Sequence, residues 1–163
     1  MGSAMNRSRQ FTVSPPLTEE HAAYLHRFNQ TRRMQRDSKL VTAMPDPARE
    51  AVGLPVGRQG GCFVGEAADD DRYRERSIMD ANKPPSGQPG LWCPWAPTKD
   101  RTGLQHTGSS SDANGKWLRY IIDHFLKPWG YTVDGLVFWE DEHASGRVKA
   151  YKNIVKSRTR YER

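Results

Sequence analysis

The sequence predicts an α+β fold, in which an antiparallel sheet carries two main helices packed on one face and a long irregular segment occupies the middle. Two segments, at about residues 18–33 and 117–126, space their apolar residues as one face of a helix requires. Within residues 131–158, further segments have the composition and spacing of strands. Chains with this order of elements usually build an antiparallel sheet covered by helices.

The first strand and the first helix are predicted near the N-terminus. Residues 10–13 form a short candidate strand, which Pro15 and Pro16 end. Thr18 is expected to cap a helix, because the two glutamates that follow it suit the positive end of the helix dipole. We expect this helix to extend to about Arg33. Its apolar face comprises Tyr24, Leu25 and Phe28.

A loop-rich section is predicted at about residues 37–116. Prolines and glycines recur throughout it, and each of them interrupts a regular period. Within this section we expect only a short helix at about residues 47–52 and a short strand at about residues 60–65. Residues 109–115 have the composition of a turn.

The second half is predicted in more detail. The apolar residues from Trp117 to Leu126 recur as one broad helical face, and Pro128 ends that helix. Apolar residues at even spacing in 131–139 then indicate a half-buried strand. Residues 147–151 and 154–158 follow as further strands, so this half should end in an antiparallel meander.

Five short motifs give the chain a family resemblance. They are Pro15-Pro16-Leu17-Thr18, Thr31-Arg32-Arg33-Met34, Gly53-Leu54-Pro55-Val56-Gly57, Gln88-Pro89-Gly90-Leu91-Trp92-Cys93 and His124-Phe125-Leu126-Lys127-Pro128-Trp129-Gly130-Tyr131. In these motifs the chain resembles a family of small uncharacterised bacterial and phage-associated proteins, over about residues 10–156. That family has no established activity. The resemblance therefore implies a stand-alone intracellular domain and assigns no catalytic residue.

Length and composition favour one domain in the cytoplasm. Residues 1–5 are interpreted as an expression remnant and residues 6–163 as a single domain. The chain contains no apolar stretch of about 20 residues, so no membrane span is expected. Two cysteines in a chain of this size favour reduced thiols over a disulfide framework.

The residue patterns favour recognition over catalysis. The five histidines are scattered and no C-x-x-C motif occurs, so neither a metal nor another cofactor is expected. Cys93 has no basic neighbour nearby in the sequence that would lower its pKa, which favours a structural thiol. A small enzyme with a pocket near Cys93 and His124 is kept as a third interpretation, and no catalytic residue is assigned.

Positive charge is concentrated at the two ends of the chain. Residues 145–163 carry seven Lys or Arg against one acid, and residues 6–39 carry seven against three, whereas the intervening residues are net acidic. This asymmetry favours an anionic partner, either a nucleic acid or an acidic protein, although basic ends can also serve solubility alone. The candidate polyanion-binding residues are Arg32, Arg33, Arg36, Lys39, Lys149, Lys152, Lys156, Arg158 and Arg160.

An accessory or inhibitory protein that binds another protein is the alternative hypothesis. The loop around Trp92 and Trp95 is framed by proline and glycine, and a rigid aromatic loop loses little entropy when it docks. Packing of these indoles as a small core is an equally good interpretation. The candidate aromatic binding residues are Trp92, Trp95, Trp129 and Tyr151.

Overall fold

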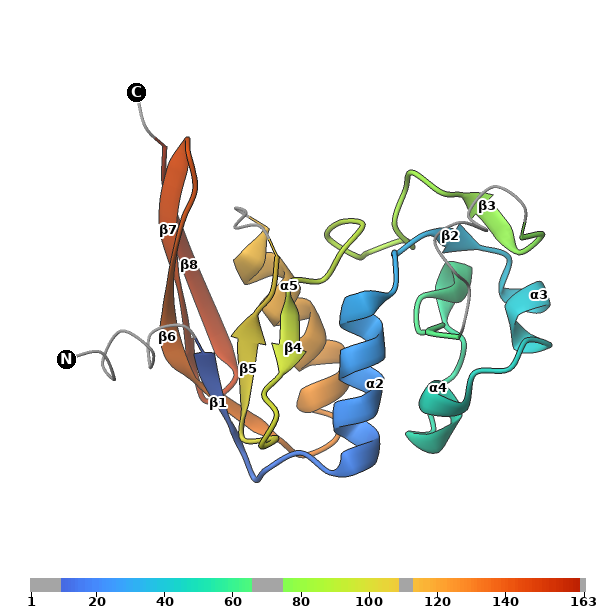
Figure 1. Ribbon diagram of the computed structural model, residues 1–163, viewed down its shortest axis with the longest axis horizontal. Coiled ribbons are helices and arrows are strands. Elements are labelled where there is room, and N and C mark those ends of the chain that lie inside the picture. The colour runs from blue at the N-terminus through green and yellow to red at the C-terminus, as the bar shows by residue number, and fades with distance from the viewer. Residues whose placement is uncertain (1–9, 66–74, 109–112, 162–163) are drawn as a thin grey trace. The chain divides into compact units, whose positions relative to one another are not determined.

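The structure, a computed structural model, describes residues 10–65, 75–108 and 113–161 (Figure 1). The interpreted expression remnant, and residues 109–112 of the predicted turn, lie outside these ranges. Contacts divide the chain into two compact units, and each is described by itself. The first combines the segment before Glu19 with the segment from Pro94 onward, and the second is Glu19–Cys93. No helix of the described residues is long and apolar enough to cross a bilayer.

The first unit is built on a six-stranded antiparallel sheet, which confirms the predicted α+β class. The strands lie in the order β4-β5-β1-β6-β7-β8. Their bounds are β1 (Gln10–Ser14), β4 (Trp95–Pro97), β5 (Gly103–His106), β6 (Thr132–Glu140), β7 (Ala144–Tyr151) and β8 (Ile154–Tyr161). The predicted C-terminal meander is therefore confirmed, whereas strands β4 and β5 were not predicted.

One helical segment of this unit packs against the sheet. Helix α5 (Asn114–Ile121) continues as the π-helix η3 (Ile122–Leu126), in which the Lys127 N–H donates to the Ile122 carbonyl at 2.8 Å. Its predicted apolar residues are buried. Gly115 lets the helix approach β8 closely, because a Cβ at this position would lie 2.6 Å from Cβ of Ser157.

Trp95 is part of the core of the first unit. Its side chain is 1% exposed, and its indole N–H donates to the Asn114 carbonyl at 2.9 Å. Its ring meets Phe11 and His106 edge-on, each with centroids 5.2 Å apart. The indole therefore ties edge strand β4 to the start of α5.

The free energy of unfolding should depend on pH because of His106, which lies in the same core. Desolvation by burial lowers the pKa of this imidazole below its ordinary value of 6.5, against the raising effect of its hydrogen bond with Asn114. The unfolded chain therefore takes up the proton first as the pH falls, so the free energy of unfolding decreases below about pH 6.5. We expect His106→Gln to reduce this loss, as measured by thermal melts between about pH 7.5 and 5.5. An unchanged pH dependence in the variant would assign the effect to other groups.

A two-residue turn fixes the register between β7 and β8. Lys152 and Asn153 have φ angles of +46° and +71°, the positive pair that tight antiparallel hairpins favour. The Asn153 side chain holds the turn against β6: its Oδ1 accepts from the Val133 N–H at 2.7 Å, and its Nδ2 donates to the Tyr131 carbonyl at 3.0 Å. As a result, Tyr151 lies opposite Ile154.

The second unit consists of short elements. They are α2 (Glu19–Gln30), β2 (Gln35–Arg36), α3 (Ser38–Thr42), α4 (Pro47–Ala51), the 3-10 helix η1 (Arg58–Gly60) and β3 (Ile78–Asp80). Helix α2 has the predicted buried residues but ends at Gln30, three residues before the predicted end. The predicted helix at about residues 47–52 is confirmed as α4, whereas the strand expected at 60–65 is wrong. Gly60 has a φ of +68°, which favours a turn at that point over a strand.

The guanidinium of Arg33 lies at the centre of this unit. It is 1% exposed and donates to Oε1 of Gln88 at 2.9 Å, to the Phe63 carbonyl at 3.0 Å and to the Gly61 carbonyl at 2.6 Å. It also lies 4.1 Å above the ring centroid of Phe28. The side chain thus joins α2, the loop after η1 and the Gln88-containing motif.

Candidate functional site

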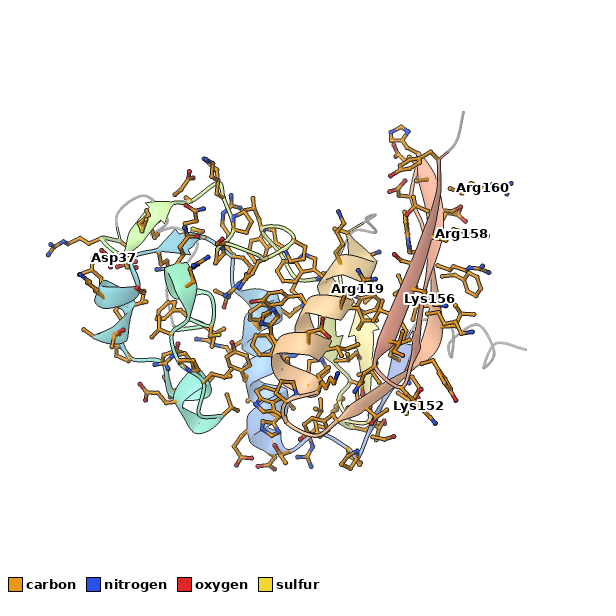
Figure 2. The ribbon with its side chains drawn as sticks, turned by 180° about the vertical axis from the view of Figure 1, so that it is seen from behind. Asp37, Arg119, Lys152, Lys156, Arg158 and Arg160 are labelled. Atoms are coloured by element: carbon orange, nitrogen blue, oxygen red, sulfur yellow. The ribbon has the colours of Figure 1, made fainter. Side chains whose placement is uncertain are left out.

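The candidate site is the face of β6, β7 and β8 that points away from α5, which we call the outer face. Side chains alternate between the two faces of a strand, and α5 approaches the face that carries Ser157. Lys156, Arg158 and Arg160 therefore project from the opposite side, as Figure 2 shows for the labelled side chains. The register places the outer-face residues of the three strands in rows.

Five cations occupy the outer face, and all are exposed. They are Arg147, Lys149, Lys156, Arg158 and Arg160. Within the described part of the chain, none of the five side chains forms an ion pair or a hydrogen bond. They are therefore available to a ligand.

Two pairs of these cations lie directly opposite each other across β7 and β8. Lys149 faces Lys156, and Arg147 faces Arg158. Like charges in directly opposed positions destabilise a sheet. The two-residue turn fixes this register. Neither strand can therefore slide along the other to move the like charges apart.

Exposed apolar and aromatic side chains border the cations. Leu136 and Phe138 on β6 lie beside Lys149 and Arg147 of the same rows. Phe138 is 57% exposed, and Tyr151, at the end of β7, is 60% exposed. Large aromatic rings left in solvent next to guanidinium and ammonium groups are an unusual use of a sheet face, and they offer a surface for stacking.

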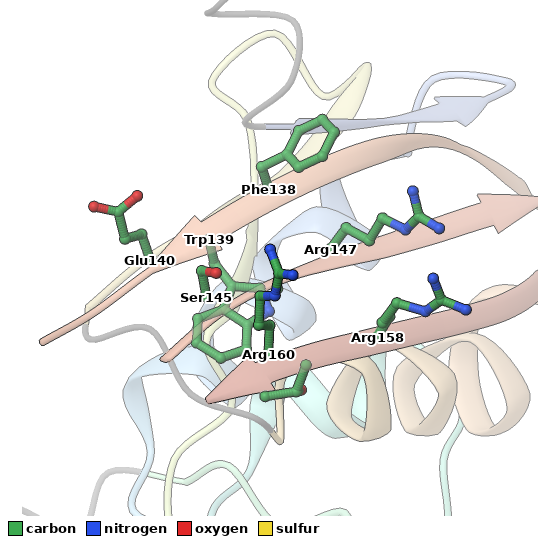
Figure 3. A pocket seen from close by; sticks show the side chains of 9 residues that line it. Phe138, Trp139, Glu140, Ser145, Arg147, Arg158 and Arg160 are labelled. Atoms are coloured by element: carbon green, nitrogen blue, oxygen red, sulfur yellow. The ribbon is translucent and has the colours of Figure 1, made fainter. Parts of the chain in front are cut away.

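A broad open hollow of about 760 Å³ lies at the end of this surface that carries Glu140, Ser145 and Arg160 (Figure 3). Its lining includes Phe138, Arg147, Arg158 and Arg160 of the outer face. It also includes Trp139 and Gly146, which alternate to the other side of the sheet. Gly146 is required there, because a Cβ would lie 2.6 Å from the Trp139 ring and from the Arg158 carbonyl. The hollow therefore spans two rows of the outer face, with cations on β7 and β8 and the carboxylate of Glu140 on β6.

The acidic residues of the outer face lie at its two ends. Asp134 lies one residue before the first pair of β6 with β7, and its Oδ1 accepts from the Lys152 N–H at 2.7 Å. Glu140 is in the row of Arg160 at the opposite end. The central rows carry cations without a carboxylate, so the field of the outer face is positive at its middle.

The structure brings together much of the predicted C-terminal cluster. Lys149, Lys156, Arg158 and Arg160 share the outer face with Tyr151. Lys152 lies in the turn, and its ammonium is 5.4 Å from the centroid of the Tyr151 ring. Arg147 and Phe138 also lie on the outer face and were not predicted. For Arg147 the sequence contains a signal, because this residue is two positions before Lys149 and so lies on the same face of a strand. For Phe138 it contains none, since only the pairing of β6 with β7 places this ring beside Arg147.

The predicted N-terminal cluster is largely not a binding surface. Arg33 and Arg36 are 1% and 2% exposed, so a phosphate cannot reach them. Arg36 instead pairs with Glu75 at 2.7 Å and donates to Ser77 Oγ at 2.8 Å. Their selection is corrected, because both guanidinium groups are buried and donate to acceptors within their own unit.

The other two members of that cluster keep some exposure. Arg32 is partly exposed and donates from Nε to the Ala81 carbonyl at 3.0 Å, and Lys39 is exposed on α3. Both belong to the second unit, whereas the outer face belongs to the first.

The tryptophan loop does not present two exposed indoles. Trp95 is buried in the first unit, which corrects its selection as an interface residue. Trp92, in the second unit, is 42% exposed. Trp129 is partly buried and stacks on Phe125 with centroids 5.8 Å apart.

The cysteines have the surroundings of structural thiols. Cys93 is 2% exposed, and its carbonyl accepts from Asn29 Nδ2 at 2.8 Å. Burial raises the pKa of the Cys62 thiol, although the charge of Arg33 and the hydroxyl of Tyr24 act in the opposite direction. A nucleophilic thiol requires a lowered pKa. Cys93 and His124 belong to different units.

Comparison with protein-family models, with curated proteins and with solved structures gives no match. The family resemblance therefore stays a prediction.

Proposed function

We propose that this protein binds an anionic polymer through the outer face of β6, β7 and β8. The observation that carries the proposal is the direct opposition of Lys149 to Lys156 and of Arg147 to Arg158. An anionic ligand between the opposed cations would relieve their repulsion. Local features that cost stability are expected at functional sites.

The spacing of the cations supports a polymeric ligand. Lys156, Arg158 and Arg160 alternate along β8, so their Cα atoms are about 7 Å apart. This separation is of the same order as that between successive phosphates in an extended chain. Several charges in a line can therefore contact one polymer at once, and their contributions add through counterion release.

Salt dependence is the first test of the proposal. With contacts to about four phosphates, the affinity for a single-stranded oligonucleotide should fall about 50-fold between about 50 and 200 mM salt. Fluorescence anisotropy with a labelled oligonucleotide and with heparin measures it. The proposal would be refuted if neither polymer bound at low salt. It would also be refuted if the measured affinity did not change with the salt concentration.

A matched pair of neutralising variants locates the binding. Arg158→Gln removes an outer-face charge, whereas Lys127→Gln removes an exposed charge at the end of η3. We expect the first to weaken binding about three- to tenfold and to reduce the salt slope by about 0.7. The second should leave both close to wild type. Equal effects of the two variants would show that net charge, and not the outer face, determines binding.

A further inference from the structure

The geometry of the outer face points to single-stranded nucleic acid as the ligand, with a base stacked on the ring of Phe138. This inference rests on the proposed function, since it requires the cations of the same face to hold the phosphates. It adds what the cations alone do not determine, namely that the polymer carries exposed planar bases.

Phe138 occupies the position that such a ligand requires. It lies in one row with Arg147 and Arg158, so a single line across the sheet runs from an aromatic ring to two guanidinium groups. A single-stranded nucleic acid whose phosphates contact the cations of β7 and β8 would direct its bases toward β6. The ring of Phe138 lies there and is 57% exposed.

Tyr151 supplies a second exposed ring at the other end of the face. It lies two rows away from Phe138, with the row of Leu136, Lys149 and Lys156 between them. The rows are separated by about 7 Å each, so the two rings are too far apart for one base and fit two different bases of one strand. A sugar-phosphate chain that carries one planar base for each phosphate matches this pattern of charge and ring.

A duplex does not match it. Paired bases are stacked on one another inside the double helix and present no face to a protein side chain. A heparin-like polysaccharide has the charges but no aromatic face. Stacking of unpaired bases on aromatic side chains is instead the common mode of binding single strands, and it tolerates any base.

The decisive experiment compares ligands that differ only in their bases. Wild-type protein is titrated with oligothymidylate, with oligouridylate and with an abasic sugar-phosphate oligomer, each of about 12 nucleotides. A duplex of the same length and heparin complete the set. We expect both base-containing single strands to bind about 5- to 100-fold more tightly than the abasic oligomer. The first two ligands distinguish DNA from RNA as the source of the strand.

Variants at Phe138 connect this difference to the ring. Phe138→Ala should lose most of the preference for bases while keeping the affinity for the abasic oligomer, and Phe138→Trp should keep the preference. Met79→Ala, which truncates an apolar side chain that is 60% exposed in the second unit, is the control and should bind as wild type. Circular dichroism melts establish that each variant is folded.

The outcomes separate the two proposals. Equal binding of oligothymidylate and the abasic oligomer would overturn base stacking and leave polymer binding intact. The same holds if Phe138→Trp, folded, loses the preference or if the duplex binds as tightly as the single strand. No binding of any of the five ligands would overturn both.

Discussion

Replacement of Arg33 by methionine is expected to unfold the second unit under mild conditions. The variant keeps the length and apolar stem of the side chain but removes the donors for Oε1 of Gln88 and the Phe63 carbonyl. Each buried acceptor that loses its partner costs about 1–3 kcal/mol. The expected decrease in the free energy of unfolding is therefore about 3–5 kcal/mol, which is a large fraction of the stability of an ordinary domain.

Hydrogen exchange resolves this loss by position. Amides within residues 19–65 and 75–93 should exchange faster in Arg33→Met, and mass spectrometry of peptides measures their rates. The adjacent Arg32→Met is the control, because Arg32 is partly exposed and its Nε makes one hydrogen bond to a carbonyl. It should cost less than about 1.5 kcal/mol. If the two variants were equally stable, the buried fork of Arg33 would not be what holds this unit together.

Arg33→Lys tests whether charge alone is sufficient. An ammonium has a single centre, whereas the three acceptors around Arg33 lie where a planar guanidinium fork reaches them together. We expect Arg33→Lys to be destabilised almost as strongly as Arg33→Met in denaturant unfolding. Recovery of wild-type stability in the lysine variant would contradict this geometric role.

The long, periodic elements were predictable from sequence, and the short ones were not. Strand β6 and helix α5 carry apolar residues at the spacing of their own type over eight or more residues. Strand β4 has three residues and ends in Pro97, a residue that argues against a strand unless the strand is at an edge. It is in fact at the edge of the sheet. Only the pairing with β5 supplies that information.

The burial of Arg33 and Arg36 was not predicted, and the reason is general. Arginine is almost always exposed, so a cluster of arginines is interpreted as surface. The acceptors that permit burial come from residues 28 to 55 positions away in the sequence, namely Gly61, Phe63 and Gln88. A single sequence contains no signal that these groups converge.

At the outer face, by contrast, the local sequence is enough to predict which cations lie opposite each other. Once Lys152 and Asn153 form a two-residue turn, the partners across β7 and β8 follow by counting outward from Tyr151 and Ile154. That count already brings Lys149 to Lys156 and Arg147 to Arg158. The contribution of Phe138 requires the register of β6 against β7, which no tight turn specifies.

The double substitution Lys156→Glu with Arg158→Glu is expected to remove binding and stabilise the fold together. It converts two opposed pairs of like charge into pairs of opposite charge, and each pair contributes about 0.2–1 kcal/mol in either direction. The free energy of unfolding should therefore rise by about 1 kcal/mol, as measured by denaturant titration. Affinity for an anionic polymer should fall more than about 100-fold at low salt, because two attractive charges become repulsive.

The opposite signs of these two effects make the prediction specific. A variant that lost binding because it misfolded would be less stable than wild type, whereas this one should be more stable. The complementary double substitution on β7, Arg147→Glu with Lys149→Glu, should reproduce both effects. It alters the same two pairs of opposed residues. Lower stability in both double variants would show that the opposed cations do not repel, and the argument that the outer face trades stability for an anionic ligand would fail.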